Sequence, residues 1–557
     1  MTPIRPLAIL NARVLTMDPL RPHAQAVYAE GGRIRAVGSN DEIRALLSAD
    51  AEIVDAGGAT LLPGLCENHL HLFSGAAELD HLQLGGVKGF DRLQEAVRAY
   101  AAGRPNEHVL HAQGADYTVL GEERLTRHHL DAILPDRPLV IVAFDHHTAW
   151  ANTKALELAG LLHGRELGPG NEIVMGEDGL ATGELREMEA FSPIFTVSGF
   201  ERYRLGLATG GEPDPKPTGD EFEKDIGIMR LGLDYCARHG FTSLTCMDGN
   251  LYQLELLSEI ERRDGFLPCR VKVPFHYKNF MPLSALEKAS MMAEKYKSEY
   301  VTSGMVKMFY DGVLESWTAV MIEPYANKPD SCGGPSLFTP EEMKAAAVEI
   351  DRRGLQIAVH AIGDGAVRAV LDAFEEAQKV NGRRDSRHRI EHVEVIHPDD
   401  IRRFRELGAI ASMQPPHPPG SMGLPLEPAV SMIGPDRWPY AYAWRTLKEA
   451  GARIPFSSDW PVTPIDPIAG IEAAVTRKPW AEGIPDQSFS LMEALAAYTV
   501  EGAYAEFQED RKGMIREGYY ADLTLLNGSI EAVEPEAIST LKPQRVVCGG
   551  RTTYFAS

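Results

Sequence analysis

Both ends of the chain consist of short apolar runs that alternate with polar residues and stop at paired glycines. This alternation predicts β-strands, since successive side chains of a strand point to opposite faces, and the paired glycines predict tight turns. We therefore expect residues 1–62 and 510–557 to join into one small β-domain around a larger inserted domain; two separate terminal modules are the alternative. The expected strands are Leu7–Leu10, Ala26–Ala29, Ile34–Val37, Ile53–Ala56, 522–526 and 546–548.

The pattern changes from about residue 240, where apolar strand-like runs alternate with helical ones. In the helical segments apolar side chains recur three and four residues apart, as at Val367, Val370, Leu371 and Phe374. Such alternation predicts a parallel sheet, either open or closed into a barrel. The expected strands are Phe241–Met247, Val271–His276, Met305–Tyr310, Gln356–His360, Arg389–Val395, Ile410–Gln414 and Ile454–Ser458.

An earlier strand that ends at 69–71 brings the count to eight, the number in a closed barrel. The fold class is therefore α/β, with a (β/α)8 TIM barrel over 63–509. Residues 83–235 interrupt the count and are expected to form a long α/β insertion after the first barrel strand. The insertion contains a loop rich in glycine and proline at 210–217 and the helical segments Asp91–Ala102, Lys154–Leu161 and Glu221–Arg238.

The composition is that of an acidic globular protein. Lysine and arginine number 56 against 79 aspartate and glutamate residues, a formal net charge of −23. This charge repels phosphate backbones and anionic lipids, which argues against nucleic acid or a membrane as a partner. The six cysteines include no CxxC pair, the N-terminus lacks a signal-peptide pattern, and no apolar stretch approaches the ~18 residues of a membrane helix. A cytoplasmic location is expected.

Side chains that bind metals lie at the ends of the expected barrel strands. His69 and His71 share one face of the first strand, and two neutral imidazoles on one face are suited to zinc. Active sites of such barrels lie at the C-terminal ends of the strands, so these side chains are expected to converge with others. Each alone has an ordinary alternative as a core, surface or capping residue, and their coincidence favours a metal site. The others are Lys307, His360, His392 and Asp459.

Longer motifs surround these residues. They are Pro63-Gly64 ahead of His69-x-His71, Lys307-x-x-x-Asp311-Gly312, Val359-His360-Ala361-Ile362-Gly363-Asp364, Arg389-Ile390-Glu391-His392, Gln414-Pro415, Ser458-Asp459, Lys512-Gly513-x-Ile515 ahead of Gly518-Tyr519-Tyr520-Ala521-Asp522, and, in the insertion, Gly114-Ala115-Asp116 and 147–152. With these motifs the chain resembles, over nearly its whole length, the amidohydrolase superfamily, most closely its YtcJ-like branch, which includes N-substituted formamide deformylases. Glu67 stands where that superfamily usually has aspartate, and Trp317 where arginine is common.

The resemblance implies a (β/α)8 barrel with a β-sandwich built from both termini. It implies one divalent ion bound by His69, His71 and Asp459. A second ion would be bound by His360 and His392, and Lys307, carboxylated by CO2, would bridge the two, because a carbamate is an anionic ligand whereas an ammonium group repels cations. With Lys307 unmodified, a single ion is expected. Zinc suits these ligands, with iron, manganese and nickel as alternatives.

The reaction expected from this resemblance is hydrolysis of a non-peptide C–N bond, such as removal of a formyl or acyl group from an amine, by metal-activated water. Asp459 would accept the proton of the water and pass it to the departing nitrogen, since one carboxylate can act as base and then as acid. A deaminase or cyclic-amide hydrolase ranks lower, because deaminases typically have His-x-x-Glu where this chain has His360-Ala361-Ile362-Gly363. A metal-binding regulator without turnover is the alternative of another class.

The expected partner is a small-molecule substrate, and a homodimer is expected because dimers are the commonest oligomers. Long loops at 325–338 and 414–420 follow strands at the expected catalytic end, where pocket walls lie. A structural role is the alternative for each side chain that we expect to contact substrate. These candidates are Asp116, His147, Asn152, Trp317 and Gln414.

Overall fold

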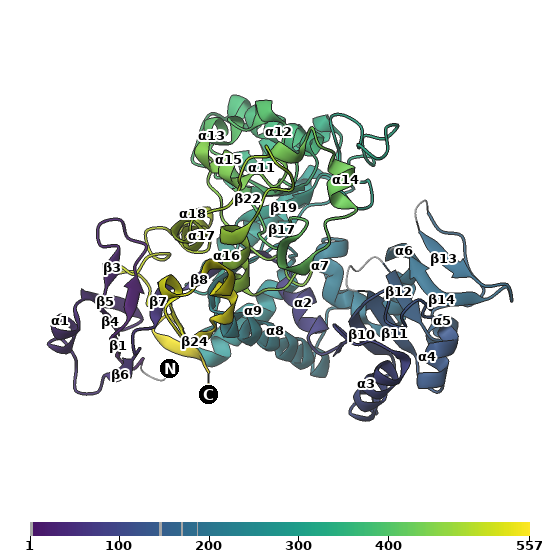
Figure 1. Cartoon of the computed structure of the whole chain (residues 1–557), viewed down its shortest axis with the longest axis horizontal. Coiled ribbons are helices and arrows are strands. Elements are labelled where there is room, and N and C mark those ends of the chain that lie inside the picture. Colours follow the sequence, from purple (N-terminus) through teal and green to yellow (C-terminus); the bar gives the residue numbers. More distant parts are fainter. Residues whose placement is uncertain (1–3, 144–147, 169–170, 187, 557) are drawn as a thin grey trace. The chain divides into compact units, whose positions relative to one another are not determined.

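The computed structural model describes residues 4–143, 148–168, 171–186 and 188–556 (Figure 1). The chain divides into two compact units. The first comprises Met1–Leu72, Thr209–Glu212 and Thr218–Ser557, and the second comprises Phe73–Ala208 and Pro213–Pro217. Both units contain helices and strands, so the mixed α/β content predicted from the sequence is confirmed. Among the described residues, no helix combines the length and the apolar character needed to cross a membrane.

Strands from both ends of the chain share one mixed sheet of the first unit, in the order β25-β24-β23-β7-β2-β3. In its centre, β7 (Thr60–Pro63) pairs in parallel with β2 (Arg13–Leu15) and antiparallel with β23 (Leu523–Leu526). The N-terminal and C-terminal segments are therefore bonded to each other directly. The remaining strands are β3 (His23–Ala24), β24 (Pro543–Cys548) and β25 (Arg551–Phe555).

A second sheet, in the order β5-β4-β1-β6, is built from N-terminal residues alone. Its strands match the predicted ones within two residues: β1 (Leu7–Leu10), β4 (Ala26–Glu30), β5 (Arg33–Gly38) and β6 (Glu52–Asp55). The pairing is mixed, since β4 lies antiparallel to β1 and to β5 whereas β6 joins β1 in parallel. The reason is the crossover through α1 (Asn40–Arg44), because parallel neighbours need a longer connection than a hairpin turn. One hydrophobic cluster contains side chains of both sheets, among them Ile9, Ile34, Leu61 and Leu525.

The predicted strand–helix repeats form parallel sheets in the described part of the first unit. One has the order β18-β16-β15-β8 and another the order β17-β19-β20-β21-β22. Residues of β8, β15, β20, β21 and β22 are buried throughout, as expected for parallel strands covered on both faces. The strands are β8 (Leu65–Leu70), β15 (Phe241–Cys246), β16 (Arg270–Lys272), β17 (Phe275–His276), β18 (Val301–Thr302), β19 (Met305–Phe309), β20 (Gln356–Ala361), β21 (Arg389–His392) and β22 (Ile410–Ser412).

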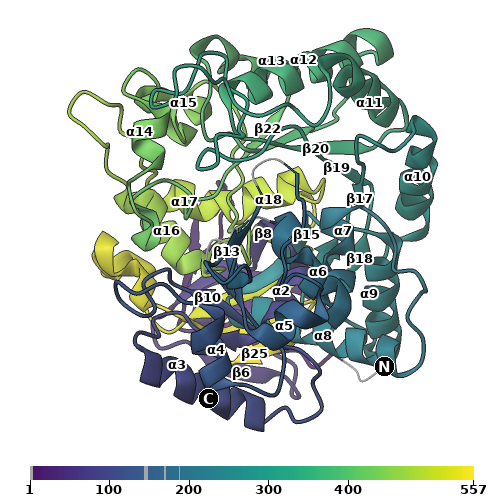
Figure 2. The same ribbon diagram turned by 90° about the vertical axis from the view of Figure 1, so that its right-hand side faces the viewer.

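Helices follow these strands, and Figure 2 shows α9 to α12 on their outer side. In α12 the predicted apolar stripe, Val367, Val370, Leu371 and Phe374, is buried. The helices of this unit are α8 (Asp220–Arg238), α9 (Leu251–Asp264), α10 (Leu286–Lys295), α11 (Pro340–Arg352), α12 (Asp364–Asn381), α13 (Arg403–Leu407), α14 (Ala429–Ile433), α15 (Trp444–Glu449), α16 (Pro467–Thr476), α17 (Leu491–Ala497) and α18 (Val500–Ala505).

Three of the predicted strands are not regular over their predicted length. The one predicted at Val271–His276 is split into β16 and β17, which belong to different sheets. The strand predicted at Arg389–Val395 stops at His392, because His392 and Val393 have φ values of 78° and 49°. The strand predicted at Ile454–Ser458 is present only as isolated parallel bridges, from Ile410 to Arg453 and from Met413 to Phe456. Pro455 lacks the N–H that a regular ladder would use.

The segment after Pro455 pairs through backbone hydrogen bonds with the end of β8. The N–H of Asp459 donates to the carbonyl of His69 at 2.9 Å, and the N–H of His71 donates to the carbonyl of Trp460 at 2.8 Å. Backbone pairing therefore links β22, the segment 453–460 and β8.

The second unit contains a mixed sheet in the order β13-β14-β12-β11-β10-β9, with β9, β10 and β11 parallel. Apolar side chains of α3 and of these strands, among them Leu93, Val97, Leu110 and Ile141, form its core. The elements of this unit are α2 (Leu72–Glu78), β9 (Leu82–Gln83), α3 (Phe90–Ala102), β10 (Leu110–Ala115), α4 (Arg127–Ile133), β11 (Leu139–Ala143), β12 (Thr148–Ala151), α5 (Thr153–Leu158), β13 (Glu172–Met175), β14 (Ala181–Arg186), α6 (Met188–Ser198) and α7 (Leu205–Ala208).

Candidate metal centre

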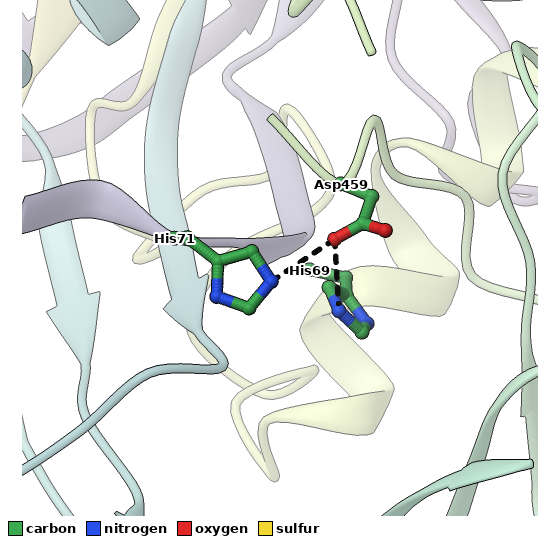
Figure 3. Close-up of side chains that lie close together, drawn as sticks. All are labelled: His69, His71 and Asp459. Atoms are coloured by element: carbon green, nitrogen blue, oxygen red, sulfur yellow. Dashed lines mark ion pairs between the residues drawn. The ribbon is translucent and has the colours of Figure 1, made fainter. Parts of the chain in front are cut away.

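Three predicted ligands, His69, His71 and Asp459, meet at the C-terminal end of β8 (Figure 3). The Nε2 atoms of both histidines lie 3.2 Å from Oδ1 of Asp459, and all three side chains are buried. Asp459 has a φ of 65°, an uncommon conformation for a residue other than glycine, and such strain is typical of functional sites. Burial alone would raise the pKa of Asp459, but the neighbouring His69 holds it well below its usual value. The carboxylate is thus ionised.

A buried ion pair orients His69. Its Nδ1 lies 2.8 Å from Oε2 of Glu391, and Arg389 donates to both oxygens of Glu391 at 2.8 and 3.0 Å. Burial favours the neutral form of Glu391, but the charge of Arg389 outweighs it and lowers the pKa of Glu391. The ionised carboxylate only accepts hydrogen bonds, so Nδ1 of His69 carries the proton and Nε2 presents its lone pair to the site. Histidines that bind metals are commonly held in this way.

Two further predicted ligands, His360 and His392, lie next to this group. The ring centroid of His392 is 4.8 Å from that of His69 and 4.5 Å from that of His360. Nδ1 of His392 lies 3.0 Å from the amide oxygen of Gln414, and the amide nitrogen of Gln414 donates to Ser457. Gln414, predicted to contact substrate, therefore holds a histidine ring of the centre. Nε2 of His360 donates to the carbonyl of Gly312 at 3.0 Å, so Nδ1 is the ring nitrogen that keeps a lone pair.

Lys307 projects from β19 and is fully buried. Its Nζ has no hydrogen-bond partner and lies 4.6 Å from the ring centroid of Phe309. Burial lowers the pKa of Lys307 to about 8, because an ammonium group loses its hydration there. A substantial fraction of this amine is therefore neutral near physiological pH.

The structure adds a histidine that the sequence did not single out, His417. Donor atoms of His392, His417 and Asp459 lie within 4.8 Å of one another. His417 occupies the loop 414–420, directly after β22. The sequence predicted that this loop lines the pocket, but its pattern does not mark which of its side chains faces the centre.

The other residues predicted to contact substrate belong to other parts of the structure or fall outside the described residues. Asp116 and Asn152 belong to the second unit, and His147 falls outside the described residues. The amide of Asn152 caps α5 and bonds to three further backbone groups of its own unit. Asp116 bonds to Thr118 and pairs with Lys88.

Trp317 lies in the loop after β19, with its indole N–H donating to Asn327. A substrate contact for Trp317, as for Asp116, His147 and Asn152, stays a prediction.

The side chains of this centre fit a divalent transition metal. Buried polar atoms are nearly always hydrogen-bonded, and exceptions call for an explanation such as a bound ion. Here the buried Nζ of Lys307 and Nε2 of His417 have no hydrogen-bond partner, and both belong to the centre. Imidazole and carboxylate donors are those that zinc and its neighbours prefer.

Known proteins resemble the chain over nearly its whole length. The amidohydrolase family matches residues 52–554. YtcJ of Bacillus subtilis is 27% identical over 565 residues, 98% of each chain, and N-substituted formamide deformylase of Arthrobacter pascens is 25% identical over 546 residues, 95% of this chain and 94% of that protein. A solved structure of an uncharacterized metal-dependent hydrolase from Pyrococcus furiosus is 27% identical, with a TM-score of 0.72 over 95% of this chain and 100% of the other. The chain belongs to the amidohydrolase family.

Proposed function

We propose that the protein is a metal-dependent hydrolase of a non-peptide C–N bond, such as the amide of an N-formyl or N-acyl amine. The observation that carries this proposal is the convergence of His69, His71 and Asp459 on one buried point in an amidohydrolase-family chain. The formamide deformylase among its relatives supports an amide substrate.

A divalent ion held by these three residues would lower the pKa of a water molecule and polarise the substrate carbonyl. Asp459 is placed for a second task. Its Oδ1 faces His69 and His71, which leaves Oδ2 to accept the proton of the water and return it to the departing nitrogen. Glu391 holds His69 in the tautomer that this arrangement requires.

Product analysis on a substrate panel tests the bond type. The zinc-loaded protein is expected to release amine and carboxylate from N-formyl or N-acyl amines and to release no ammonia from amino-substituted heterocycles. Ammonia release without amide cleavage would instead favour the deaminase alternative. Full metal binding with no hydrolysis of any substrate on the panel would favour the alternative of a metal-binding regulator.

We propose further that Lys307 is carboxylated when CO2 is present and then helps to bind a second ion with His360 and His392. Its buried amine with a lowered pKa supports this, because only the neutral amine reacts with CO2. Peptide mass analysis under mild conditions is expected to show one added CO2 on Lys307 in bicarbonate. An unmodified lysine there would leave a single-ion centre.

The fold that supports this chemistry is, we propose, a closed (β/α)8 barrel over 63–509. Its support is the backbone pairing that links β22, the segment 453–460 and β8. The two terminal sheets, which share a hydrophobic cluster, would form a β-sandwich from 1–62 and 510–557. The insertion predicted over 83–235 overlaps the second unit as far as Pro217, whereas α8 at its end lies in the first unit. A homodimeric state and a cytoplasmic location stay predictions from the sequence alone.

A further inference from the structure

Asp459 lies between two sets of imidazoles, and one carboxylate oxygen faces each set. Its Oδ1 is 3.2 Å from Nε2 of His69 and of His71, whereas its Oδ2 is 3.6 Å from Nε2 of His417. His392 completes the second set, since its ring stacks on His417 with the centroids 5.6 Å apart and the planes within 7°. The second set therefore offers the same donors as the first, two imidazoles and one carboxylate oxygen.

The side chains around His417 hold it as those around His69 hold that ring. Nδ1 of His417 lies 3.4 Å from Oε1 of Glu394, and the hydroxyl of Tyr442 donates to the other oxygen of Glu394 at 2.9 Å. The backbone N–H of Tyr442 also donates to the carbonyl of Glu394 at 2.7 Å. Nε2 of His417 is buried without a hydrogen-bond partner. A carboxylate behind one ring nitrogen and a nitrogen without a hydrogen bond in front is the arrangement of a metal-binding histidine.

Prolines and hydrogen bonds restrain the loop that carries His417. Four prolines flank the histidine in Pro415-Pro416-His417-Pro418-Pro419, and proline fixes φ. The His417 N–H donates to the carbonyl of Gln414 at 3.1 Å, and the indole of Trp480 donates to the carbonyl of Pro419 at 3.1 Å. A donor held in this way loses little conformational freedom when a ligand binds.

We propose that His392, His417 and Asp459 form a second zinc site, and that zinc bound there inhibits the hydrolase. The inhibition rests on the proposed function, because a second ion would take Oδ2 of Asp459, the oxygen that accepts the proton. Imidazole donors select zinc or a similar transition metal over magnesium or calcium. The rate should therefore rise until one zinc is bound per chain and fall as a second one binds.

Zinc titration of the metal-depleted full chain tests the site. The buffer excludes CO2, so that a carbamate on Lys307 cannot draw the second ion toward His360. Bound zinc and the rate of hydrolysis are measured together. The wild-type protein is expected to bind two zinc ions and to lose activity with the second, whereas His417→Ala is expected to bind one and to show no decline. His23→Ala, which changes an exposed histidine of β3, is the matched control and should behave as wild type.

A milder variant keeps the test independent of folding. Glu394→Gln retains His417 but loses the charge behind it, and is expected to weaken binding of the second zinc by about 10–100-fold while circular dichroism stays unchanged. Two zinc ions on His417→Ala with wild-type affinity, or only one on the wild type, would overturn the site. Undiminished activity with two zinc ions bound would overturn the inhibition. Absence of hydrolysis at one zinc per chain would instead contradict the proposed function and the inhibition with it, while the zinc count still decides whether the site exists.

Discussion

Asp459→Asn is expected to lower kcat by about 10²–10⁴-fold while zinc still binds, because this is the usual contribution of general acid–base catalysis. The variant keeps an oxygen of similar position for the ion, and His69 and His71 remain. It removes the proton acceptor, since an amide has no comparable basicity. Steady-state kinetics on an amide substrate, with zinc counted on the same sample, measures both effects.

The control for this substitution is Asp399→Asn, which makes the same chemical change at a side chain that is 82% exposed. It should leave both kcat and zinc content unchanged. If Asp459→Asn with zinc bound kept more than about a hundredth of wild-type kcat, the proton would have another acceptor, because removal of a catalytic base costs at least about 10²-fold.

Arg389→Met is expected to lower the free energy of unfolding by about 3–5 kcal/mol, since removing one partner leaves a buried charge uncompensated. Arg389 and Glu391 are both fully buried, and Arg389 also donates to the carbonyl of Asn68 and to Ser412. Urea denaturation measures the loss. Zinc affinity should fall as well, because Glu391 orients His69.

Two further variants show whether the loss of stability comes from breaking the buried ion pair or from removing any arginine. Arg262 is 70% exposed and pairs with Glu259, so Arg262→Met should cost no more than about 1 kcal/mol. The double variant Arg389→Met/Glu391→Gln should recover part of the stability, since it removes the uncompensated charge. A loss below about 1 kcal/mol for Arg389→Met would show that solvent reaches Glu391.

Strand periodicity was sufficient to predict that the first group of candidate ligands would lie together. The C-terminal ends of parallel strands meet at one edge, so His69, His71 and Asp459 could be expected to converge although Asp459 is far away in the sequence. The structure places all three together. The same reasoning could not reach His417, because a loop beyond a strand end has no periodicity and its path is set by proline and by tertiary hydrogen bonds.

Hydrogen bonds and ion pairs between residues far apart in the sequence could not be predicted from the sequence either. Arg389 and Glu391 stood in a recognised motif, but nothing local indicates that Glu391 bonds to His69, 322 positions away. The helix-capping contact of Asn152, in contrast, is local in the sequence. Its place just before α5 is that of a helix cap, and the structure gives its side chain this role. An asparagine ahead of a predicted helix carried that signal in the sequence.

Restoring zinc stepwise to the metal-depleted full chain, up to one ion per chain, tests most directly whether hydrolysis depends on the ion held by His69, His71 and Asp459. The rate of amide hydrolysis should start near zero and rise in proportion to bound zinc, and His71→Ala should neither retain this ion nor gain activity. Full hydrolysis by the metal-free protein, or undiminished zinc binding and activity in His71→Ala, would contradict the account.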